Sequence, residues 1–333
     1  MNGKRKIIAV TGATGHLGGN LVRALLEQGE RVRVLVHRDR RALEGLDLEL
    51  IPGDILDPDS LRRAFADAAT VYHSAARISI TGDRDGMVYR TNVEGTRNVV
   101  NACLSGGVER LVHFSSIHAI SGRLKDGVVD ETGRLVLDDP DVPAYDRSKA
   151  LGELEVRRGI KEGLDAIIIA PTGVIGPHDY KPSRMGQVLL DICHHRMPAL
   201  IDGGYNWVDA RDVIKMALAA AESGRSGEKY LASGNWVHFR ELARIIGEVA
   251  GHPVTRLITP MWLGRAAAPF AVGWSRVAGT RPLFTPEGLR ALRRHRHVSC
   301  WKADLEFGYR PRPIDETIAD TLSWFKEAGM LEG

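Results

Sequence analysis

Short apolar runs alternate with longer stretches of helical periodicity through the first half of this chain. An apolar run bounded by turn residues predicts a strand, and apolar residues that recur every three or four positions predict a helix. We predict strands over 6–11, 31–36, 48–51, 70–74, 110–115 and 166–170. We predict helices over 17–28, 59–66, 88–105 and 144–161. This repeated order predicts an α/β fold with a doubly wound parallel sheet and helices on both of its faces.

Beyond Pro171 the alternation weakens, and proline, glycine, tryptophan and tyrosine become more frequent. We predict helices near 185–195 and 209–222, a short strand over 229–232, and mainly helical structure from Phe239 onward. The second half of the chain therefore differs in character from the first.

This change divides the chain into two parts. The first part, 1–175, carries the repeated strands and helices and receives 207–233 back from further along the chain. The second part, 176–206 together with 234–333, is predicted to form a smaller, mostly helical C-terminal lobe that binds the substrate. The sequence contains no internal repeats or long linkers.

The composition is ordinary for a globular protein, since 44% of the 333 residues are hydrophobic and 26% are charged. A formal net charge of +3 gives no strong attraction to nucleic acid, so we expect no such partner. Three cysteines, Cys103, Cys193 and Cys300, are far apart and lack zinc-binding spacing, which fits a reducing cytosol. We also expect no signal peptide, and therefore a cytoplasmic protein.

No apolar run reaches the roughly 18 residues that a membrane-spanning helix needs. The nearest candidate, 260–274, is interrupted by Arg265. We interpret it as a buried or pocket-lining helix, with a weak contact to a membrane surface as the alternative. We therefore expect no transmembrane segment.

A cluster of glycines marks the first candidate site. Gly12, Gly15 and Gly18 follow the first predicted strand directly and open the first predicted helix. Glycines there permit a tight turn and let backbone N–H groups approach a pyrophosphate, which a helix N-terminus favours electrostatically. The turn predicts a Rossmann-type domain that binds a dinucleotide, with an ordinary strand-helix turn as the alternative. No Gly-Lys-Ser/Thr follows, which disfavours a P-loop nucleotide hydrolase.

The end of the second predicted strand bears on the choice between NAD and NADP. An acid normally lies there when the ribose 2′-hydroxyl is bound. Here Val36, His37 and Arg38 occupy the place, and the first acid is Asp39. Because an arginine beside the adenosine ribose suits a 2′-phosphate, we predict that NADP(H) is preferred over NAD(H). The alternative is that Arg38 and Arg40 form a solvated basic turn.

Asp54 follows the third predicted strand, with Ile55 beside it. A carboxylate at this place can accept a hydrogen bond from the adenine amino group. Asp57 and Asp59 follow closely, so the alternative is an acid that only stabilises a helix N-terminus.

Tyr145 and Lys149 are the main candidates for chemistry. They are four residues apart in a predicted helix, which puts both on one face. A free tyrosine, with a pKa of about 10, is a poor acid or base near neutrality. We expect the Lys149 ammonium, together with the charge of an oxidised nicotinamide, to lower the pKa of Tyr145 and suit it to general acid–base catalysis.

Two serines lie at the end of the fifth predicted strand, Ser115 and Ser116. A hydroxyl at the carboxyl edge of a parallel sheet faces the cofactor crevice. We predict that Ser116 hydrogen-bonds a substrate carbonyl oxygen beside Tyr145, with Ser115 as the alternative because the register of the strand can shift by one.

Together these motifs resemble the extended short-chain dehydrogenase/reductases, also called the epimerase/dehydratase superfamily. The resemblance covers nearly the whole chain. Its motifs are Thr11-Gly12-Ala13-Thr14-Gly15-His16-Leu17-Gly18, Gly53-Asp54, His73-Ser74-Ala75-Ala76, Asn92-Val93-Glu94-Gly95-Thr96-Arg97-Asn98, Ser115-Ser116, Tyr145 with Lys149, Pro171-Thr172-Gly173-Val174-Ile175-Gly176-Pro177, Trp207-Val208-Asp209-Ala210-Arg211-Asp212-Val213, and 302–311.

The resemblance implies a role for each matching residue. Tyr145 would be the acid/base, and Lys149 would hold the nicotinamide ribose and tune the tyrosine. Ser116 would orient the substrate oxygen, and Asn92 would stabilise the long helix near the site and support a proton relay. Besides Tyr145 and Lys149, the expected cofactor contacts are Gly12, Thr14, Gly15, His16, Leu17, Gly18, His37, Arg38, Asp54, Ile55, Ser74, Ala75, Ala76, Ser115, Pro171, Thr172, Gly173 and Val174. The expected substrate contacts are Arg77, Ile117, His118, His178 and Trp207.

Within the superfamily, the chain is most similar to the dihydroflavonol-reductase and 3β-hydroxysteroid-dehydrogenase branch. The shared features are 34–38, the Ser-Ser-Ile run and the apolar 260–279. Dihydroflavonol reductases carry Arg at the position of His37, so the expected contact with a 2′-phosphate rests on Arg38. Bacterial members of the branch include reductases of long-chain β-keto acids and proteins described as hopanoid-associated sugar epimerases, so the branch does not set the substrate.

The second lobe is apolar and aromatic, which favours a hydrophobic ketone or alcohol as substrate. A nucleotide-sugar site would need cations for the diphosphate, and Lys181, Arg184, Arg211 and Arg281 are candidates. The alternative is that the aromatic residues only form the core of the lobe. They are Trp207, Trp236, Trp262, Phe270, Trp274 and Phe284.

We predict an NADP(H)-dependent oxidoreductase that interconverts a ketone and a secondary alcohol on a fairly apolar small molecule, such as a β-keto acid or a steroid- or flavonoid-like compound. The alternatives are a nucleotide-sugar epimerase or dehydratase with tightly bound NAD(P), and a non-catalytic NADP-binding regulator. We expect no metal, because 194–195 and 293–297 lack ligand spacing and suit a solvated basic face. Many relatives are dimers, and 88–105 and 144–161 would form the interface of a homodimer.

Overall fold

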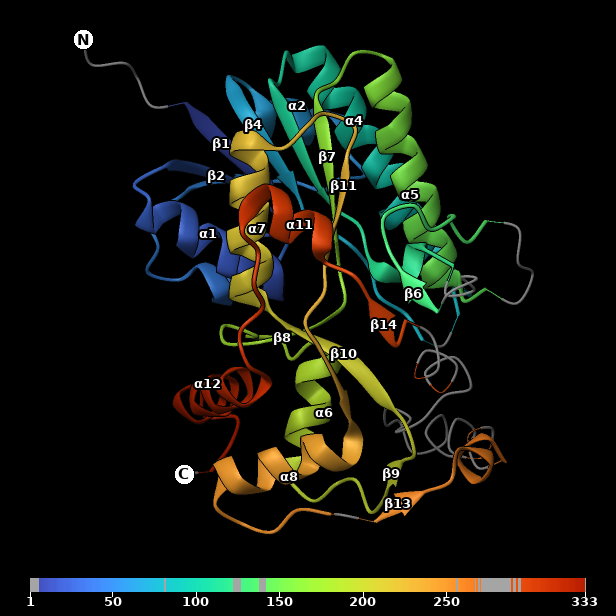
Figure 1. Cartoon of the computed structure of the whole chain (residues 1–333). Coiled ribbons are helices and arrows are strands. Elements are labelled where there is room, and N and C mark those ends of the chain that lie inside the picture. Colours follow the sequence, from blue (N-terminus) through green and yellow to red (C-terminus); the bar gives the residue numbers. More distant parts are fainter. Residues whose placement is uncertain are drawn as a thin grey trace.

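A parallel sheet forms the centre of the larger part of the molecule (Figure 1). The computed structural model describes residues 6–80, 82–121, 127–137, 142–255, 257–266, 268, 270, 289, 292 and 295–332. Seven strands lie in the order β11-β7-β5-β4-β1-β2-β3, and every neighbouring pair is parallel. They are β1 (Ile7–Thr11), β2 (Arg31–Val36), β3 (Glu49–Pro52), β4 (Ala68–His73), β5 (Arg110–Phe114), β7 (Ala166–Pro171) and β11 (Lys229–Ala232). The predicted fold class is confirmed.

Helices cover both faces of this sheet because alternate strand residues point to opposite sides. One face carries α1 (His16–Glu27), α7 (Ala210–Ser223) and α11 (Trp301–Phe307), and the other carries α2 (Pro58–Phe65), α4 (Gly95–Gly106) and α5 (Ala144–Lys161). In β7, Ile167 and Ile169 pack with the first group and Ile168 with the second. Both sides of the strand are buried, which explains its continuous apolar run.

The strand order reverses beside β1, since β2 lies on one side of it and β4 on the other. In open α/β sheets, ligands bind at such a reversal, outside the carboxyl ends of the strands. The turn over 12–18 follows β1, and Ser74 follows β4. The topology therefore brings two of the predicted cofactor segments to the same edge of the sheet, where such a crevice is expected.

The long helix predicted over 88–105 is interrupted. It consists of α3 (Met87–Tyr89), a π-helical turn η2 (Arg90–Glu94) and α4. Asn92, in the π-helical turn, binds groups outside its own helix, and such turns often accompany functional sites. The sequence pattern predicts one continuous helix here, because the partners of Asn92, Arg77 and Ser148, lie outside this helix.

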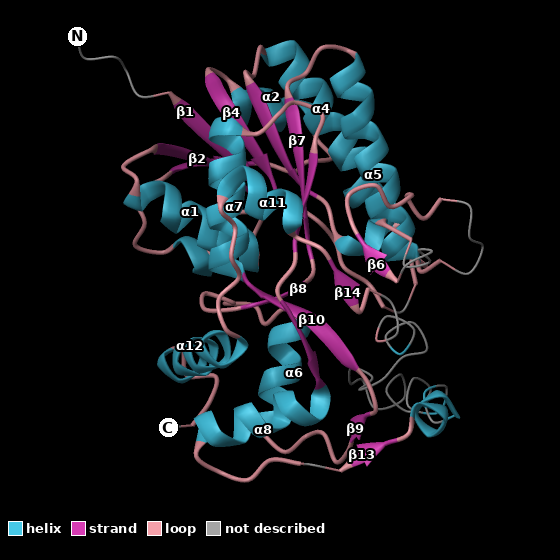
Figure 2. Cartoon of the chain, viewed as in Figure 1, coloured by secondary structure: helices cyan, strands magenta, loops and turns pink. Residues whose placement is uncertain are grey.

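Besides its helices, the lobe contains a small sheet that the sequence did not indicate (Figure 2). In it β10 (Gly204–Asp209) pairs antiparallel with β12 (Asn235–His238) and parallel with β8 (Gly173–Ile175). The remaining elements of the lobe are α6 (Arg184–Cys193), α8 (Phe239–Ala250), α12 (Ile314–Glu327), and the short pair β9 (Leu200–Ile201) and β13 (Ile258–Thr259). Residues 207–209 thus belong to the small sheet, and the chain rejoins the large sheet at α7 and β11.

Two later segments also return to the larger part. α11 packs against α7 and β11, and β14 (His297–Val298) pairs with β6 (Val128–Val129). Much of the apolar stretch 260–279 lies outside the described residues, as do Trp274, Arg281 and Phe284. Among the helices that are described, none is both long and apolar enough to cross a bilayer.

Candidate active site

The glycine turn is built for close backbone approach. Gly12 has φ +75°, and a Cβ there would overlap the backbone of Ser74 and Ala75. A Cβ on Gly18 would overlap the carbonyl of Gly12, so glycine also allows α1 to begin against β1. Gly15 caps α1 with no side-chain hydrogen bond, which leaves the first N–H groups of the helix for an anion. These features fit the pyrophosphate of a dinucleotide.

The His16 side chain turns away from this cradle. Its Nε2 lies 3.1 Å from the carbonyl oxygens of both Gly176 and Pro177, and its Nδ1 lies 4.0 Å from Asp179. It therefore ties the glycine turn to the first residues of the lobe. A contact between His16 and a cofactor would therefore have to come from the backbone of His16. The sequence does not indicate that its side chain is directed elsewhere.

At the expected adenine end, Asp54 is not the helix cap. Asp57 caps α2 by accepting the Asp59 N–H at 3.0 Å. Asp54 accepts the Leu56 N–H at 2.9 Å, and its other oxygen lies 3.7 Å from His37 Nε2. Ile55 is buried, so only its backbone is available to a cofactor.

The first acid after β2 is already paired. Both carboxylate oxygens of Asp39 accept hydrogen bonds from Arg41, at 3.0 and 2.6 Å, and this arginine lowers the pKa of Asp39 to about 2. Arg38 is exposed and makes no hydrogen bond or ion pair with any described residue. The turn thus presents Arg38 as a cation without a partner among the described residues, and Asp39 as a carboxylate already paired with Arg41.

The two serines after β5 point to different partners. The Ser115 hydroxyl donates to Glu153 at 3.2 Å, inside the molecule. Ser116 caps the short helix η3 (Ile117–Ala119) by accepting the His118 N–H at 3.2 Å, and it hydrogen-bonds Tyr145. The geometry therefore pairs Ser116, rather than Ser115, with the tyrosine.

Tyr145 and Lys149 lie on one face of α5, but they do not interact as expected. Burial raises the pKa of Tyr145 to about 12, which the hydrogen bond with Ser116 only partly offsets. Lys149 donates to the carbonyl oxygen of Phe114 at 2.7 Å, and burial lowers its pKa to about 8. In this structure desolvation outweighs the hydrogen bond from Ser116, and the lowering of the Tyr145 pKa by Lys149 together with an oxidised nicotinamide stays a prediction. The tyrosine is a protonated acid near neutrality.

Asn92 is a bridge between two elements. Its amide nitrogen donates to the Ser148 hydroxyl at 2.8 Å and to the Arg77 carbonyl at 2.9 Å, and its oxygen accepts the Arg77 N–H at 2.8 Å. Gly152 lets α5 lie against the Asn92 carbonyl, because a Cβ there would overlap it. The asparagine thus fixes α5 relative to the loop after β4.

The other expected cofactor segments line the same edge of the sheet. Ser74 donates to the Thr11 carbonyl at 2.9 Å, while Ala75 is half-buried and Ala76 exposed. Thr172 donates to the Asn206 side chain at 2.9 Å, which joins the end of β7 to the small sheet. Of the rest, Leu17 and Val174 pack beside the core, Thr14 is half-buried, and Pro171 pairs with Ala232.

Two expected substrate contacts are buried instead. Ile117 is 1% exposed in a cluster with Ile120 and Val129, and Trp207 is 1% exposed in the core of the lobe. Both side chains pack inside the protein here, and their contact with a substrate stays a prediction. Trp207 packs edge-on against Tyr205 and Phe239.

The two remaining histidine candidates lie in different places. His118 lies at the site, with its ring centroid 6.0 Å from that of Tyr145. His178 instead packs on Tyr180 and Trp324, and burial lowers its pKa to about 4.

Arg77, another expected substrate contact, lies on the surface, where its side chain pairs with Asp85 at 3.0 Å.

His118, an expected substrate contact, is the centre of a cluster whose other members the sequence analysis missed. Its Nε2 lies 2.5 Å from the Tyr205 hydroxyl, its Nδ1 lies 3.4 Å from Asp146, and its ring lies 5.8 Å from that of His295. His295 is buried and hydrogen-bonded to the Ile120 carbonyl at 2.9 Å, so the solvated face predicted over 293–297 is wrong for this residue. Tyr205 and Trp207 are two residues apart, which in a strand places both aromatic side chains on one face. This spacing is the signal in the sequence that could have indicated Tyr205.

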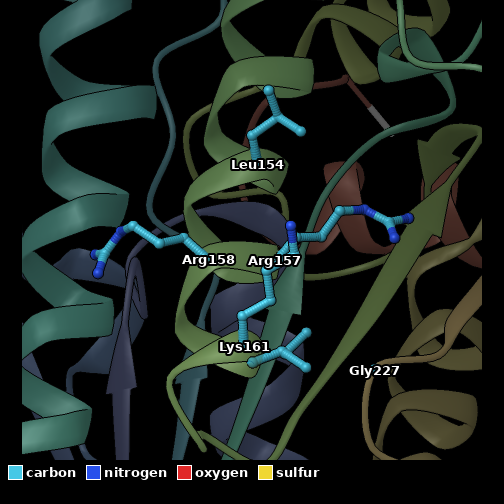
Figure 3. Close-up of a pocket in the computed structure, with 6 residues that line it drawn as sticks. Leu154, Arg157, Arg158, Lys161 and Gly227 are labelled. Atoms are coloured by element: carbon cyan, nitrogen blue, oxygen red, sulfur yellow. The ribbon is translucent and has the colours of Figure 1, made fainter.

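A hollow of about 450 Å³ lies along the second half of α5 (Figure 3). It is lined by Leu154, Arg157, Arg158, Ile160, Lys161 and Gly227. Tyr145 and Lys149 belong to the first turns of the helix, so this hollow is separate from the crevice. The described residues contain no group of His, Cys, Asp and Glu that could hold a metal ion.

The fold and this constellation define an enzyme that works with a nicotinamide cofactor. Residues 8–233 match the NAD dependent epimerase/dehydratase family, and the chain belongs to this family of extended short-chain dehydrogenase/reductases. It is an NAD(P)-binding oxidoreductase of that class.

Relatives match over almost the whole length. Sterol demethylase protein B of Methylococcus capsulatus is 37% identical, covering 97% of this chain and 99% of the relative. The sterol-4-alpha-carboxylate 3-dehydrogenase ERG26 of Saccharomyces cerevisiae is 26% identical, covering 96% and 98%. The solved structure of gox2253 is 34% identical with a TM-score of 0.85, covering 98% of this chain and all of the other. The similarity thus extends through both parts of the chain.

Proposed function

We propose that this protein is an NADP(H)-dependent oxidoreductase that interconverts a ketone and a secondary alcohol on an apolar small molecule. The arrangement of Ser116, Tyr145 and Lys149 at the carboxyl end of β5 carries the proposal. The bound nicotinamide would supply or accept the hydride. In the direction of reduction, Ser116 holds the substrate oxygen and the protonated Tyr145 donates the proton that this oxygen needs.

The cofactor preference rests on the turn after β2. Arg38 is free while Asp39 is bound to Arg41, so a 2′-phosphate would meet a cation and no repelling acid. A ribose 2′-hydroxyl finds no available carboxylate in that turn. Both features favour NADP(H).

The substrate class rests on the lobe and on the relatives. A sterol dehydrogenase and a sterol demethylase protein are similar to this chain over their full length, and we infer a polycyclic or long-chain substrate from them. A nucleotide sugar is disfavoured because one of its candidate cations, Arg211, already binds Asp209 at 2.8 Å and Asp320 at 2.6 Å. An apolar ketone needs no such cation.

One assay tests the proposal. The protein is mixed with NADPH and a panel of apolar ketones, including 3-keto steroids and long-chain β-keto acids, and absorbance at the NADPH band is followed. Net consumption is expected, whereas an epimerase would return its cofactor unchanged. Tyr145→Phe should reduce turnover by about 10³-fold and leave the NADPH dissociation constant unchanged. Loss of NADPH binding in this variant would contradict the catalytic role.

We also propose that the protein forms a homodimer through α4 and α5. Many relatives in the superfamily are dimers, and Leu154 on the outer surface of α5 is an exposed apolar side chain that such an interface would cover. Light scattering coupled to gel filtration would give the mass, and a monomer at micromolar concentration would overturn this part.

A further inference from the structure

A buried carboxylate lies one helical turn beyond Lys149 on α5. Glu153 is fully buried, and its Oε1 accepts hydrogen bonds from Lys229 Nζ at 2.7 Å and from Arg157 Nε at 3.0 Å. Its Oε2 accepts the Ser115 hydroxyl at 3.2 Å. Burying a carboxylate costs several kcal/mol, and an ion pair recovers this only when the geometry is good.

A contribution to stability is a weak explanation for the buried carboxylate of Glu153. Lys229 is 3% exposed, and an apolar pair of similar volume in place of Glu153 and Lys229 would be about as stable. The single carboxylate also faces Lys149, so it serves two buried cations as well as Arg157. Without it, the buried Lys149 would lose its counter-charge, and Lys229 would face only Glu131.

The spacing on α5 connects this carboxylate to the chemistry. Tyr145, Lys149, Glu153 and Arg157 follow one another at intervals of four residues, which puts them in one row along the helix. The row runs from the crevice to the hollow in Figure 3, where Arg157 is partly exposed. The hydrogen bond from Ser115 ties the same carboxylate to the residue before Ser116.

We propose that Glu153 is a positioning residue of the active site, which supplies from one helical turn away the negative charge that balances Lys149. This inference rests on the proposed function, in which we expect Lys149 to hold the nicotinamide ribose.

The other groups that face Lys149 leave Glu153 as its main counter-charge. From β4 and β5 come His73 and His113, and burial lowers both pKa values so far that the rings are neutral near pH 7, that of His73 to about 3. From β11 comes Lys229, a like charge that Glu131 also faces.

On α5 itself, Tyr145 is protonated and Asp146 is turned to His118. Burial lowers the pKa of Lys149, and Glu153 acts in the opposite direction. An opposite charge at this range shifts a pKa by about one unit or more. Removing it should therefore reduce the charged fraction of Lys149 at pH 8 from about one half to about one tenth.

The experiment follows Lys149 directly and without ligand. The full chain is labelled with ¹³C at lysine Cε, and NMR titration from pH 6 to 10.5 gives the midpoint of each lysine. The signal of Lys149 is identified by its absence from Lys149→Met. We expect a midpoint near pH 8 in the natural chain and one about one pH unit lower in Glu153→Gln.

Two further variants keep the test decisive. Ser115→Ala removes a hydrogen bond to Glu153 but no charge, so the Lys149 midpoint should stay within about 0.3 pH units. Glu153→Gln can fail to fold because Lys229 loses its partner. The double variant Glu153→Gln/Lys229→Met removes one charge of each sign, and its Lys149 midpoint should lie about one pH unit below that of Lys229→Met alone.

An unchanged Lys149 midpoint in Glu153→Gln, or in the double variant relative to Lys229→Met, would overturn the inference and leave Glu153 a structural role only. The proposed function is tested separately, by turnover in Tyr145→Phe and Lys149→Met. Either result can fail while the other holds.

Discussion

The two sides of the crevice are built in different ways. On the cofactor side, one continuous turn over 12–18 makes the site with its backbone, and glycines permit the close approach. On the side where we propose that the substrate binds, single side chains come from distant parts of the chain, with His118 after β5, Tyr205 on β10 and His295 just before β14. A backbone site depends on local conformation, whereas a side-chain site depends on how three segments are packed.

Among changes in ligand binding, the largest is expected on the cofactor side. Gly12→Ala should weaken NADPH binding by at least about 100-fold, because a left-handed φ and an overlap with Ser74 and Ala75 both oppose the new Cβ. Fluorescence titration with NADPH measures this. Gly106→Ala is the matched control, since a Cβ there meets nothing within 4 Å, and its affinity should be unchanged. Equal affinities in the two variants would refute a backbone-built site.

Lys149 lies where the two sides meet, and its burial should cost stability. Its pKa is lowered from 10.5 to about 8, which corresponds to about 3 kcal/mol of folding free energy below pH 8. Between pH 8 and 10.5 the unfolded chain keeps a proton that the folded chain has released, so this cost fades as pH rises.

Lys149→Met should therefore raise the free energy of unfolding at pH 7 by about 1–2 kcal/mol, after the lost hydrogen bond to Phe114 is subtracted. Urea unfolding at several pH values checks this. The gain should shrink towards pH 10, and a gain that grows with pH would have the wrong sign.

A smaller effect is expected at the turn after β2. Arg38→Ala should weaken NADPH binding by about 10-fold and leave NADH binding within about twofold, because an exposed charged contact is worth little more than 1 kcal/mol. Competition titrations with both cofactors give the ratio. Arg40→Ala, also exposed in the same turn, is the control. An equal loss for both cofactors would remove the argument for NADP(H).

The smallest effect should come from the substrate side. Tyr205→Phe removes only the hydroxyl that binds His118, so KM for the best ketone of the panel should rise by about three- to fivefold. NADPH affinity should stay the same. If NADPH affinity changed while KM for the ketone did not, the cluster around His118 would act on the cofactor and not on the substrate.

Local signals explain which features the sequence predicts well. The predicted helix 144–161 agrees with α5 residue for residue, and the strands of the large sheet lie within two residues of their predicted ends. An apolar run marks a strand that is buried on both faces, and helical periodicity marks a helix that is buried on one. Both patterns lie within a short stretch of neighbouring residues. The π-helical turn at Asn92 has no such signal, because its partners Arg77 and Ser148 are far away in the sequence.

The sequence by itself determined the doubly wound fold, the glycine turn and the spacing of Tyr145 and Lys149, since each depends on residues within a few turns of one another. Only the tertiary structure decided which serine meets Tyr145, that Ile117 and Trp207 are buried, and that His118 meets Tyr205 and His295. The same holds for the pKa of Tyr145, because desolvation is a property of everything packed around a group.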